Sequence, residues 1–283
     1  MYTALRRFKP FFRDLVEKRT ALIGAVLVVL FILTGLLAPM LAPHPPNRIN
    51  LRRSLETPSL EYPFGTDNHG RCVFSRVLHG ARLSLYVAVA SIVTALVIGV
   101  FFGLLAGYFS SLQAPIMRIV DVMLAFPGII VALIVIAILG TGINNVVFAI
   151  AISRIPQFVR LVNGSVLSVR EALYVEAARA TGETDGSIIA RYILPNCFGP
   201  IMVQTSLMIP AAIMTAASLS FLGLGVQPPQ AEWGAMINLG REWMQAAPHV
   251  IYAPGFSLVA VVLGFNLLGD GLRDILDPTL RRG

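Results

Sequence analysis

The chain has 283 residues, of which 56% are hydrophobic and only 13% are charged. Soluble domains carry about 25% charged residues, so this composition excludes an ordinary soluble enzyme. From Leu83 to Ser153 only Arg118 and Asp121 are charged, which indicates a polytopic membrane protein. The formal net charge of +7 does not indicate nucleic-acid binding, because the basic residues lie between apolar spans, where they orient membrane helices.

Six apolar segments, each near the roughly 20 residues that a bilayer requires, predict an all-α protein with six transmembrane helices. The first apolar segment is long and follows a polar, basic stretch, residues 1–20, so we expect a retained span rather than a cleaved signal peptide. In chain order the predicted spans cover residues 21–41, 83–107, 122–139, 145–160, 198–222 and 250–268.

The basic character of residues 1–20 places them in the cytoplasm. Six spans then place a polar segment, residues 161–196, and the C-terminal tail in the cytoplasm, and the connection 42–82 outside. Both cytoplasmic stretches carry arginines, namely Arg170, Arg179 and Arg191 in the segment and Arg273, Arg281 and Arg282 in the tail. The connection 42–82 fits less well because its arginines outnumber its acids, although the rule weakens for long loops. Those arginines are Arg48, Arg52, Arg53, Arg71, Arg76 and Arg82.

The two cysteines, Cys72 and Cys197, are too few for a disulfide framework, and the four histidines show no metal-ligand spacing. The predicted topology places the cysteines on opposite sides of the membrane. They cannot form an intrachain bridge there, because bridged Cα atoms lie within about 7 Å of each other. We therefore predict neither a disulfide nor a metal site.

The polar segment 161–196 has the features of a docking platform for a soluble partner. Ser168 and Glu171 have capping-box spacing, which predicts a helix that starts near Val169. Gly182 is placed to end that helix. The apolar residues of 188–193 predict a second short amphipathic helix, which Pro195 would stop. An ordinary connector between two spans is the alternative interpretation.

Within this segment, Glu176-Ala177-Ala178, then Gly182 and finally Leu194-Pro195 resemble the EAA loop of ABC importer permeases. In those proteins the loop is the seat of the ATP-hydrolysing subunit. The resemblance therefore implies that these six residues couple the chain to an ATPase. Tyr192 departs from the pattern, which has an aliphatic residue at its position.

Further segments, in order over residues 20–280, resemble the C-type permeases of dipeptide, oligopeptide and nickel importers. Cys72 stands where that family usually has Asp, so an acid's role there is not implied. The matching segments are Phe64-Gly65-Thr66-Asp67, Gly70-Arg71, Ser75-Arg76, Gly80-Ala81-Arg82-Leu83-Ser84-Leu85, Arg118-Ile119-Val120-Asp121, Phe126-Pro127, Phe221-Leu222-Gly223-Leu224-Gly225, Glu232-Trp233-Gly234, Asn266-Leu267-Leu268-Gly269-Asp270-Gly271-Leu272-Arg273-Asp274 and Asp277-Pro278.

The resemblance implies a multi-pass protein of the bacterial inner membrane with both termini in the cytoplasm. Its fold would be that of a type I ABC importer, with a five-helix core within residues 83–283 and a peripheral first helix. Its partners would be a homologous B-type permease, two ATPase subunits and an extracytoplasmic solute-binding protein. ATP and Mg would bind the ATPase subunits, because this chain has no Walker A sequence and only two lysines, Lys9 and Lys18.

Two features of the spans are candidates for packing and for transport. Gly99, Gly103 and Gly107 repeat every four residues, a pattern that lets helix backbones approach closely, either within the chain or against a second permease. Arg154 lies about 18 Å below the Gly142 turn at ~1.5 Å per residue. A charge at that depth is a candidate for the translocation path, and snorkelling to the headgroups is the alternative.

Other functions remain open at this point. Peptides, nickel chelates and opines share this permease pattern, so the sequence does not identify the substrate. A secondary transporter would need buried acids in interrupted helices, whereas Asp121 and Asp270 lie at span ends. An intramembrane enzyme would need a nucleophile with a base or metal ligands at depth, and no span carries such a set.

Overall fold

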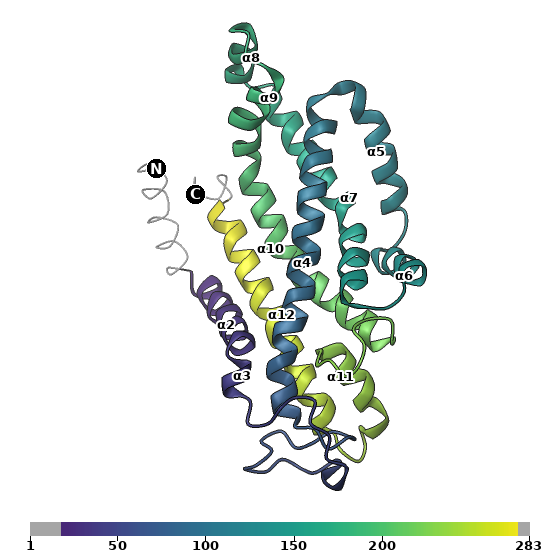
Figure 1. Ribbon diagram of the computed structural model, residues 1–283. Coiled ribbons are helices and arrows are strands. Elements are labelled where there is room, and N and C mark those ends of the chain that lie inside the picture. Colours follow the sequence, from purple (N-terminus) through teal and green to yellow (C-terminus); the bar gives the residue numbers. More distant parts are fainter. Residues whose placement is uncertain (1–17, 277–283) are drawn as a thin grey trace.

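Long helices dominate the computed structural model, which describes residues 18–276 and has no strand among them (Figure 1). The expectations for residues 1–17 and for Arg281 and Arg282 lie outside the described residues. The helices are α2 (Arg19–Leu36), α3 (Ala38–Leu41), α4 (Val73–Tyr108), α5 (Ser110–Leu124), α6 (Gly128–Leu139), α7 (Ile143–Arg170), α8 (Leu173–Ala180), α9 (Asp185–Ile188), α10 (Leu194–Phe221), α11 (Trp233–Gly240) and α12 (His249–Leu276), with short turns η1 (Leu51–Arg53), η2 (Ile189–Ile193) and η3 (Arg241–Trp243).

Within residues 18–276, five units are long and apolar enough to cross a membrane: α2, α4, α7, the continuous stretch Asp185–Phe221, and α12. The predicted span 122–139 is wrong as a single helix. The chain breaks there into α5 and α6, which meet at 91°. Pro127 causes the break, because its ring disfavours the helical conformation of Phe126 and Pro127 itself is extended, with ψ 132°. Counting the bent pair as one span gives up to six.

The helices also run beyond the predicted spans. α4 has 36 residues and begins at Val73, and α7 continues to Arg170 rather than ending near Arg160. Val162 and Val166 in this extension are fully buried. The extension is amphipathic, so its average hydropathy is low although one face packs as a core helix does.

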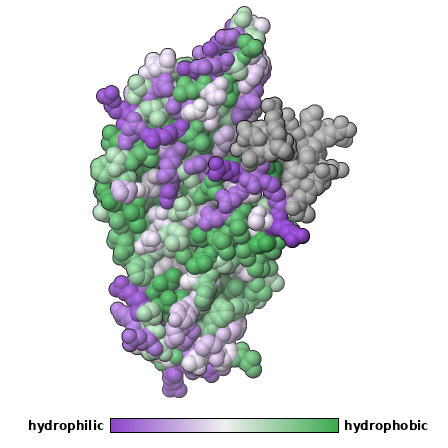
Figure 2. Space-filling model, turned by 180° about the vertical axis from the view of Figure 1, so that it is seen from behind, coloured by the Kyte–Doolittle hydropathy of each residue, from purple (hydrophilic) through white to green (hydrophobic). Residues whose placement is uncertain are grey.

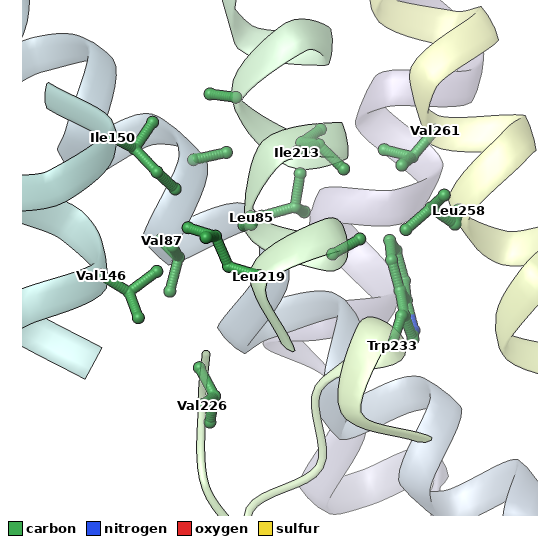
Figure 3. Packing of buried hydrophobic residues seen from close by; sticks show 14 of the residues in the cluster. Leu85, Val87, Val146, Ile150, Ile213, Leu219, Val226, Trp233, Leu258 and Val261 are labelled. Carbon is green, nitrogen blue, oxygen red and sulfur yellow. The ribbon is translucent and has the colours of Figure 1, made fainter. Parts of the chain in front are cut away.

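Two clusters of buried apolar residues hold the bundle together. The larger one joins α4, α7, α10 and α12, and Figure 3 shows Leu85, Ile150, Ile213 and Val261 from these helices pointing toward one another. The smaller one lies where α4 and α7 meet α8, α9 and the start of α10. The outer surface is arranged as a membrane requires: Figure 2 shows hydrophobic residues predominating between two more hydrophilic ends.

The helix α2 is attached mainly to α12. A side chain on Gly24 would lie 2.4 Å from the backbone nitrogen of Leu268, and one on Gly271 would lie 2.3 Å from Cβ of Ala21. Two glycines thus bring the helix backbones together, as small residues do in membrane helix pairs. The first helix is therefore a peripheral addition that packs tightly on the bundle.

A buried turn, Glu232-Trp233-Gly234, connects the start of α11 to α4. Glu232 is 1% exposed and accepts hydrogen bonds from the N–H groups of Gly234 and Ala235, at 3.0 and 2.8 Å, as an N-cap. Burial raises the pKa of this carboxyl. Trp233 is fully buried and its Nε1 donates to the carbonyl of Val77 at 3.0 Å. This motif fixes the connection between α10 and α12 onto α4.

The connection that precedes α4 is held by a buried ion cluster. Arg71 Nε donates to Asp67 Oδ2 at 2.7 Å, and Arg76 Nε lies 3.7 Å from the same oxygen. Arg71 is 4% exposed and Arg76 is 1% exposed. The Nη1 group of Arg76 also donates to the carbonyls of Pro46 and Pro229 and to Oδ1 of Asn47. Both arginines are therefore structural: Arg71 braces the connection internally through Asp67, and Arg76, in α4, fastens residues 42–72 to the bundle.

Candidate coupling site and translocation path

The helices α8 and α9 project beyond one end of the bundle, at the top of Figure 1. The predicted helix start near Val169 is wrong, because Ser168, Val169 and Arg170 complete α7 and α8 begins at Leu173 after the extended Ala172. No side chain caps α8. The burial of one face of α7 against the smaller cluster outweighs the capping-box signal.

Gly182 ends α8, as its position predicted. Its φ is +81°, its N–H donates to the carbonyl of Arg179 at 3.0 Å, and the N–H of Glu183 donates to the carbonyl of Ala178 at 3.1 Å. These two bonds form a Schellman motif, which requires a left-handed residue at that position. A Cβ atom at Gly182 would meet no other atom within 4 Å, so the glycine is needed for its backbone conformation and not for space.

The EAA residues lie on two different faces of α8. Glu176 and Ala177 are exposed, whereas Ala178 is 6% exposed and packs inward together with Val175. The bulky Leu173 is 81% exposed next to them. The face that a partner can touch therefore comprises Glu176, Ala177 and neighbouring apolar surface, and Ala178 anchors the helix to its own chain.

The second short helix does not end at Pro195. α9 continues through the π-helical turn η2 into α10, with Leu194 and Pro195 in the first turn of α10. The π-helical turn changes the hydrogen-bond pattern directly before Pro195, because the N–H of Leu194 donates to the carbonyl of Ile189, five residues back. Ile188 and Ile193 are fully buried on the smaller cluster, which keeps this path continuous.

Polar contacts seat the projecting segment on the bundle. The hydroxyl of Tyr108, at the end of α4, donates to Asp185 Oδ1, and the guanidinium of Arg179 lies 5.3 Å from the centre of the Tyr108 ring. The carboxylate of Glu183 accepts hydrogen bonds from Ser187 at 2.7 Å and from Tyr192 at 2.8 Å. The Ser187 bond, followed by that from Tyr192, lowers the pKa of Glu183.

These contacts explain the departure at Tyr192 and add a residue that sequence reasoning missed. The hydroxyl of Tyr192 donates to the carboxylate of Glu183, a hydrogen bond that an aliphatic side chain could not make. Tyr108 links α4 to the projecting segment through both its hydroxyl and its ring. The only signal in the sequence was an aromatic residue at the end of an apolar span, and many spans have one.

The three glycines of α4 face α7 of the same chain. A Cβ atom at Gly99 would lie 2.4 Å from Cβ of Phe158, one at Gly103 2.6 Å from Cβ of Val162, and one at Gly107 2.5 Å from Cβ of Val166. All three distances are much shorter than a normal van der Waals contact between carbon atoms. The backbones of α4 and α7 can therefore lie this close only because these three positions carry no side chain.

Arg154 lies near the middle of α7 and contacts the C-terminal half of α10. Its Nη2 donates to Thr215 Oγ1 at 3.0 Å and to the carbonyl of Ala211 at 3.3 Å. Its Nε is buried and has no hydrogen-bond partner among the described residues. The side chain is half-buried and bonds sideways to α10, so it does not extend along α7 toward a headgroup region.

The two cysteines belong to opposite ends of the bundle. Cys72 precedes α4 at the end that carries the 42–72 connection, and Cys197 lies in the first turn of α10 next to the projecting segment. Both are free, and they are 2% and 0% exposed. Their burial makes both poor targets for thiol reagents in the folded protein.

Comparisons with known proteins agree with this architecture. Residues 80–282 match the family model described as "binding-protein-dependent transport system inner membrane component", and residues 4–58 match that of the N-terminal TM domain of oligopeptide transport permease C. A dipeptide transport system permease protein from Alkalihalophilus pseudofirmus is 44% identical over 99% of this chain and 92% of its own. A glutathione transport system permease protein from Pectobacterium atrosepticum is 45% identical over 97% of this chain and 92% of its own.

Two solved structures share the fold. One is an inward-facing methionine ABC transporter, with a TM-score of 0.59 at 18% identity over 71% of this chain and 96% of that one. The other is an amino acid ABC transporter, with a TM-score of 0.52 at 14% identity over 74% of this chain and 95% of that one. The chain therefore belongs to the family of inner membrane components of binding-protein-dependent transport systems, the permease subunits of ABC importers.

Proposed function

We propose that this permease forms half of the translocation pathway of an ATP-driven importer for peptides. The observation that carries the proposal is the α8–α9 projection at one end of an apolar bundle, where Glu176 and Ala177 are exposed on a rigidly seated helix. The relatives named for dipeptide and glutathione transport support peptides over nickel chelates and opines.

The projection is the seat of an ATPase subunit in this proposal. The residues exposed there and available to a partner are Glu176, Ala177, Gly182 and Pro195. Ala178 is buried and packs α8 against its own chain. The complete importer would contain a homologous B-type permease, two ATPase subunits that bind ATP and Mg, and an extracytoplasmic binding protein. The projection would then be cytoplasmic, both termini would be cytoplasmic, and residues 42–72 would lie outside.

Reconstitution tests this function and this orientation together. The permease and its partner subunits are placed in vesicles, with the binding protein on the side of residues 42–72 and ATP on the side of α8. We expect uptake of a labelled dipeptide and faster ATP hydrolysis when the peptide-loaded binding protein is added. Uptake that continues without ATP would indicate a secondary transporter, and hydrolysis that ignores the binding protein would contradict the proposed assembly.

Arg154 is the residue of this chain that we assign to the peptide path. Its guanidinium is fixed on α10 through Thr215 and Ala211, and its Nε retains an unused donor in a low-dielectric setting. A charge kept at this depth is best explained by an anionic group that passes it, and every peptide offers its terminal carboxylate.

Replacing Arg154 with Gln should reduce uptake of a dipeptide with a free carboxylate by about tenfold, which corresponds to a loss of about 1.4 kcal/mol of interaction free energy. Uptake of the C-terminally amidated dipeptide should fall much less, and basal ATP hydrolysis should persist. Arg154→Lys should retain part of the activity, since it keeps the charge but not the forked contacts to α10. Equal uptake by all three proteins at matched membrane levels would remove Arg154 from the path.

A further inference from the structure

A second polar site lies on the other side of the bundle's midpoint from α8, where the α6–α7 turn approaches the loop after α10. It is a pocket of about 620 Å³, a size typical of small-molecule sites. Its lining contains four amide side chains and one aromatic residue but no acid or base, and these five residues are Tyr86, Asn144, Asn145, Gln227 and Gln230.

The orientation of two of these amides follows from their hydrogen bonds. Asn145 Nδ2 donates to the carbonyls of Leu139 and Gly140, at 2.8 and 3.1 Å. Gln227 Nε2 donates to the carbonyls of Gly223 and Gly225, both at 3.0 Å. Rotating either amide by 180° would bring its oxygen against two carbonyl oxygens, so the donor assignment is determined by the chain itself.

The side-chain oxygens of Asn145 and Gln227 are therefore fixed acceptors. Within residues 18–276 neither oxygen accepts a hydrogen bond, whereas both amide nitrogens are fully used. The pocket thus favours ligands that bring N–H donors. Tyr86, which is 52% exposed, also lines the pocket and offers an aromatic ring, and aromatic faces attract ammonium groups.

We propose that this pocket binds the protonated amino terminus of the transported peptide. The oxygens of Asn145 and Gln227 accept its N–H bonds, and Tyr86 contributes its ring. The absence of acids from the lining makes the site weak enough to release its ligand, which a transport path requires. This assignment rests on the proposed function and complements Arg154, which meets the opposite charge of the peptide. A lysine side chain of the docked binding protein offers the same chemistry, and the experiment distinguishes the two sources.

Gln230 provides the test position. It lines the pocket, is exposed, and makes no side-chain hydrogen bond within the described part of the chain, so its replacement leaves the fold intact. Gln230→Lys introduces a positive charge that repels an ammonium group, and Gln230→Met has a similar length without the charge. The measured quantity is the ratio of dipeptide uptake by the two variants in the complete reconstituted importer. The same binding protein delivers the same dipeptide to both variants, so its preference among peptides affects both uptake rates equally and cancels in the ratio.

We expect the Gln230→Lys to Gln230→Met uptake ratio to be about 0.1 at pH 7, because two like charges repel at short range. The ratio should rise toward one at pH 9. The peptide amino group, with a pKa of about 8, is then largely neutral, whereas the introduced lysine, with a pKa of about 10.4, is still charged.

Three results would overturn the assignment. A ratio near one at pH 7 shows that no ammonium group meets this pocket. A low ratio that does not change with pH, together with weaker stimulation of ATP hydrolysis by the binding protein, assigns the pocket to a docking lysine instead of the peptide. A low, pH-independent ratio with normal stimulation also contradicts it. Failure of the wild-type importer to take up any peptide overturns the proposed function itself, and is thus distinguishable from the other three.

Discussion

Replacing Gly99, Gly103 and Gly107 together with alanine should prevent the permease from accumulating as a folded protein. Each added Cβ would lie between 2.4 and 2.6 Å from a Cβ atom of α7. At Gly103 the Val159 carbonyl oxygen is also only 3.0 Å away, so a side-chain rotation cannot relieve the crowding. Forcing atoms into a packed interior costs about 1–3 kcal/mol per site, so three sites on one helix pair cost about 3–9 kcal/mol together, which is comparable to the about 5–15 kcal/mol that stabilises a whole domain.

The single variant Gly103→Ala makes this effect measurable. Unfolding of the purified protein by denaturing detergent should show a loss of about 2 kcal/mol. Gly164→Ala is the matched control, since Gly164 lies on the partner helix α7 and a Cβ there meets no atom within 4 Å. That control should be neutral or slightly stabilising, because alanine is the better helix former by about 1 kcal/mol. Equal loss in both variants would show that α4 and α7 are not in backbone contact.

The membrane character and the family were predictable because they depend on local signals. Apolar runs, the EAA segment and the order of the linked motifs can all be read without knowing which residues meet. The break at Phe126-Pro127 was not predicted, because the hydropathy of 122–139 gave no reason to divide the span. A proline in an apolar run signals either a kink or a complete break, and only the packing of α6 on α7 decides between them.

The details of the coupling site depended on contacts that sequence does not reveal. Ser168 and Glu171 have the spacing of a capping box, yet the apolar stripe of α7 carries the helix past them. Ala178 belongs to the EAA motif but faces inward, because α8 packs on the smaller cluster through it and Val175. Tyr108 belongs to the site although it lies 77 positions before its hydrogen-bond partner Asp185 in the sequence.

The basic connection before α4 illustrates the same point. The arginines of the connection 42–82 outnumber its acids, so by the positive-inside tendency this connection is a poor candidate for the outer side of the membrane. Arg71 and Arg76 are nevertheless buried against Asp67 and backbone carbonyls, so they do not act as exposed charges that orient a helix. The positive-inside tendency applies to exposed basic residues near span ends, and burial removes these two from the count.

Replacing Gly182 with valine should uncouple ATP hydrolysis from peptide uptake. Gly182 has a φ of +81°, which a β-branched residue adopts only at a cost of about 1–3 kcal/mol. The Schellman bonds from Gly182 and Glu183 to the end of α8 would be lost, and the angle between α8 and α9 would change. The transmembrane bundle should be unaffected, because Gly182 is exposed and an added Cβ atom would meet no other atom within 4 Å.

Reconstituted Gly182→Val importer should therefore reach normal membrane levels but take up dipeptide at least about tenfold more slowly, since 1.4 kcal/mol changes an equilibrium tenfold. Gly182→Asn should retain most of the uptake, because asparagine adopts the left-handed conformation more readily than other side chains. Gly186→Val is the matched control: Gly186 lies in α9, has an ordinary φ and has equally open space around it. If the asparagine variant failed as badly as the valine variant, the backbone conformation would not be the cause. Normal uptake by Gly182→Val would mean that the turn after α8 does not transmit the motion of an ATPase.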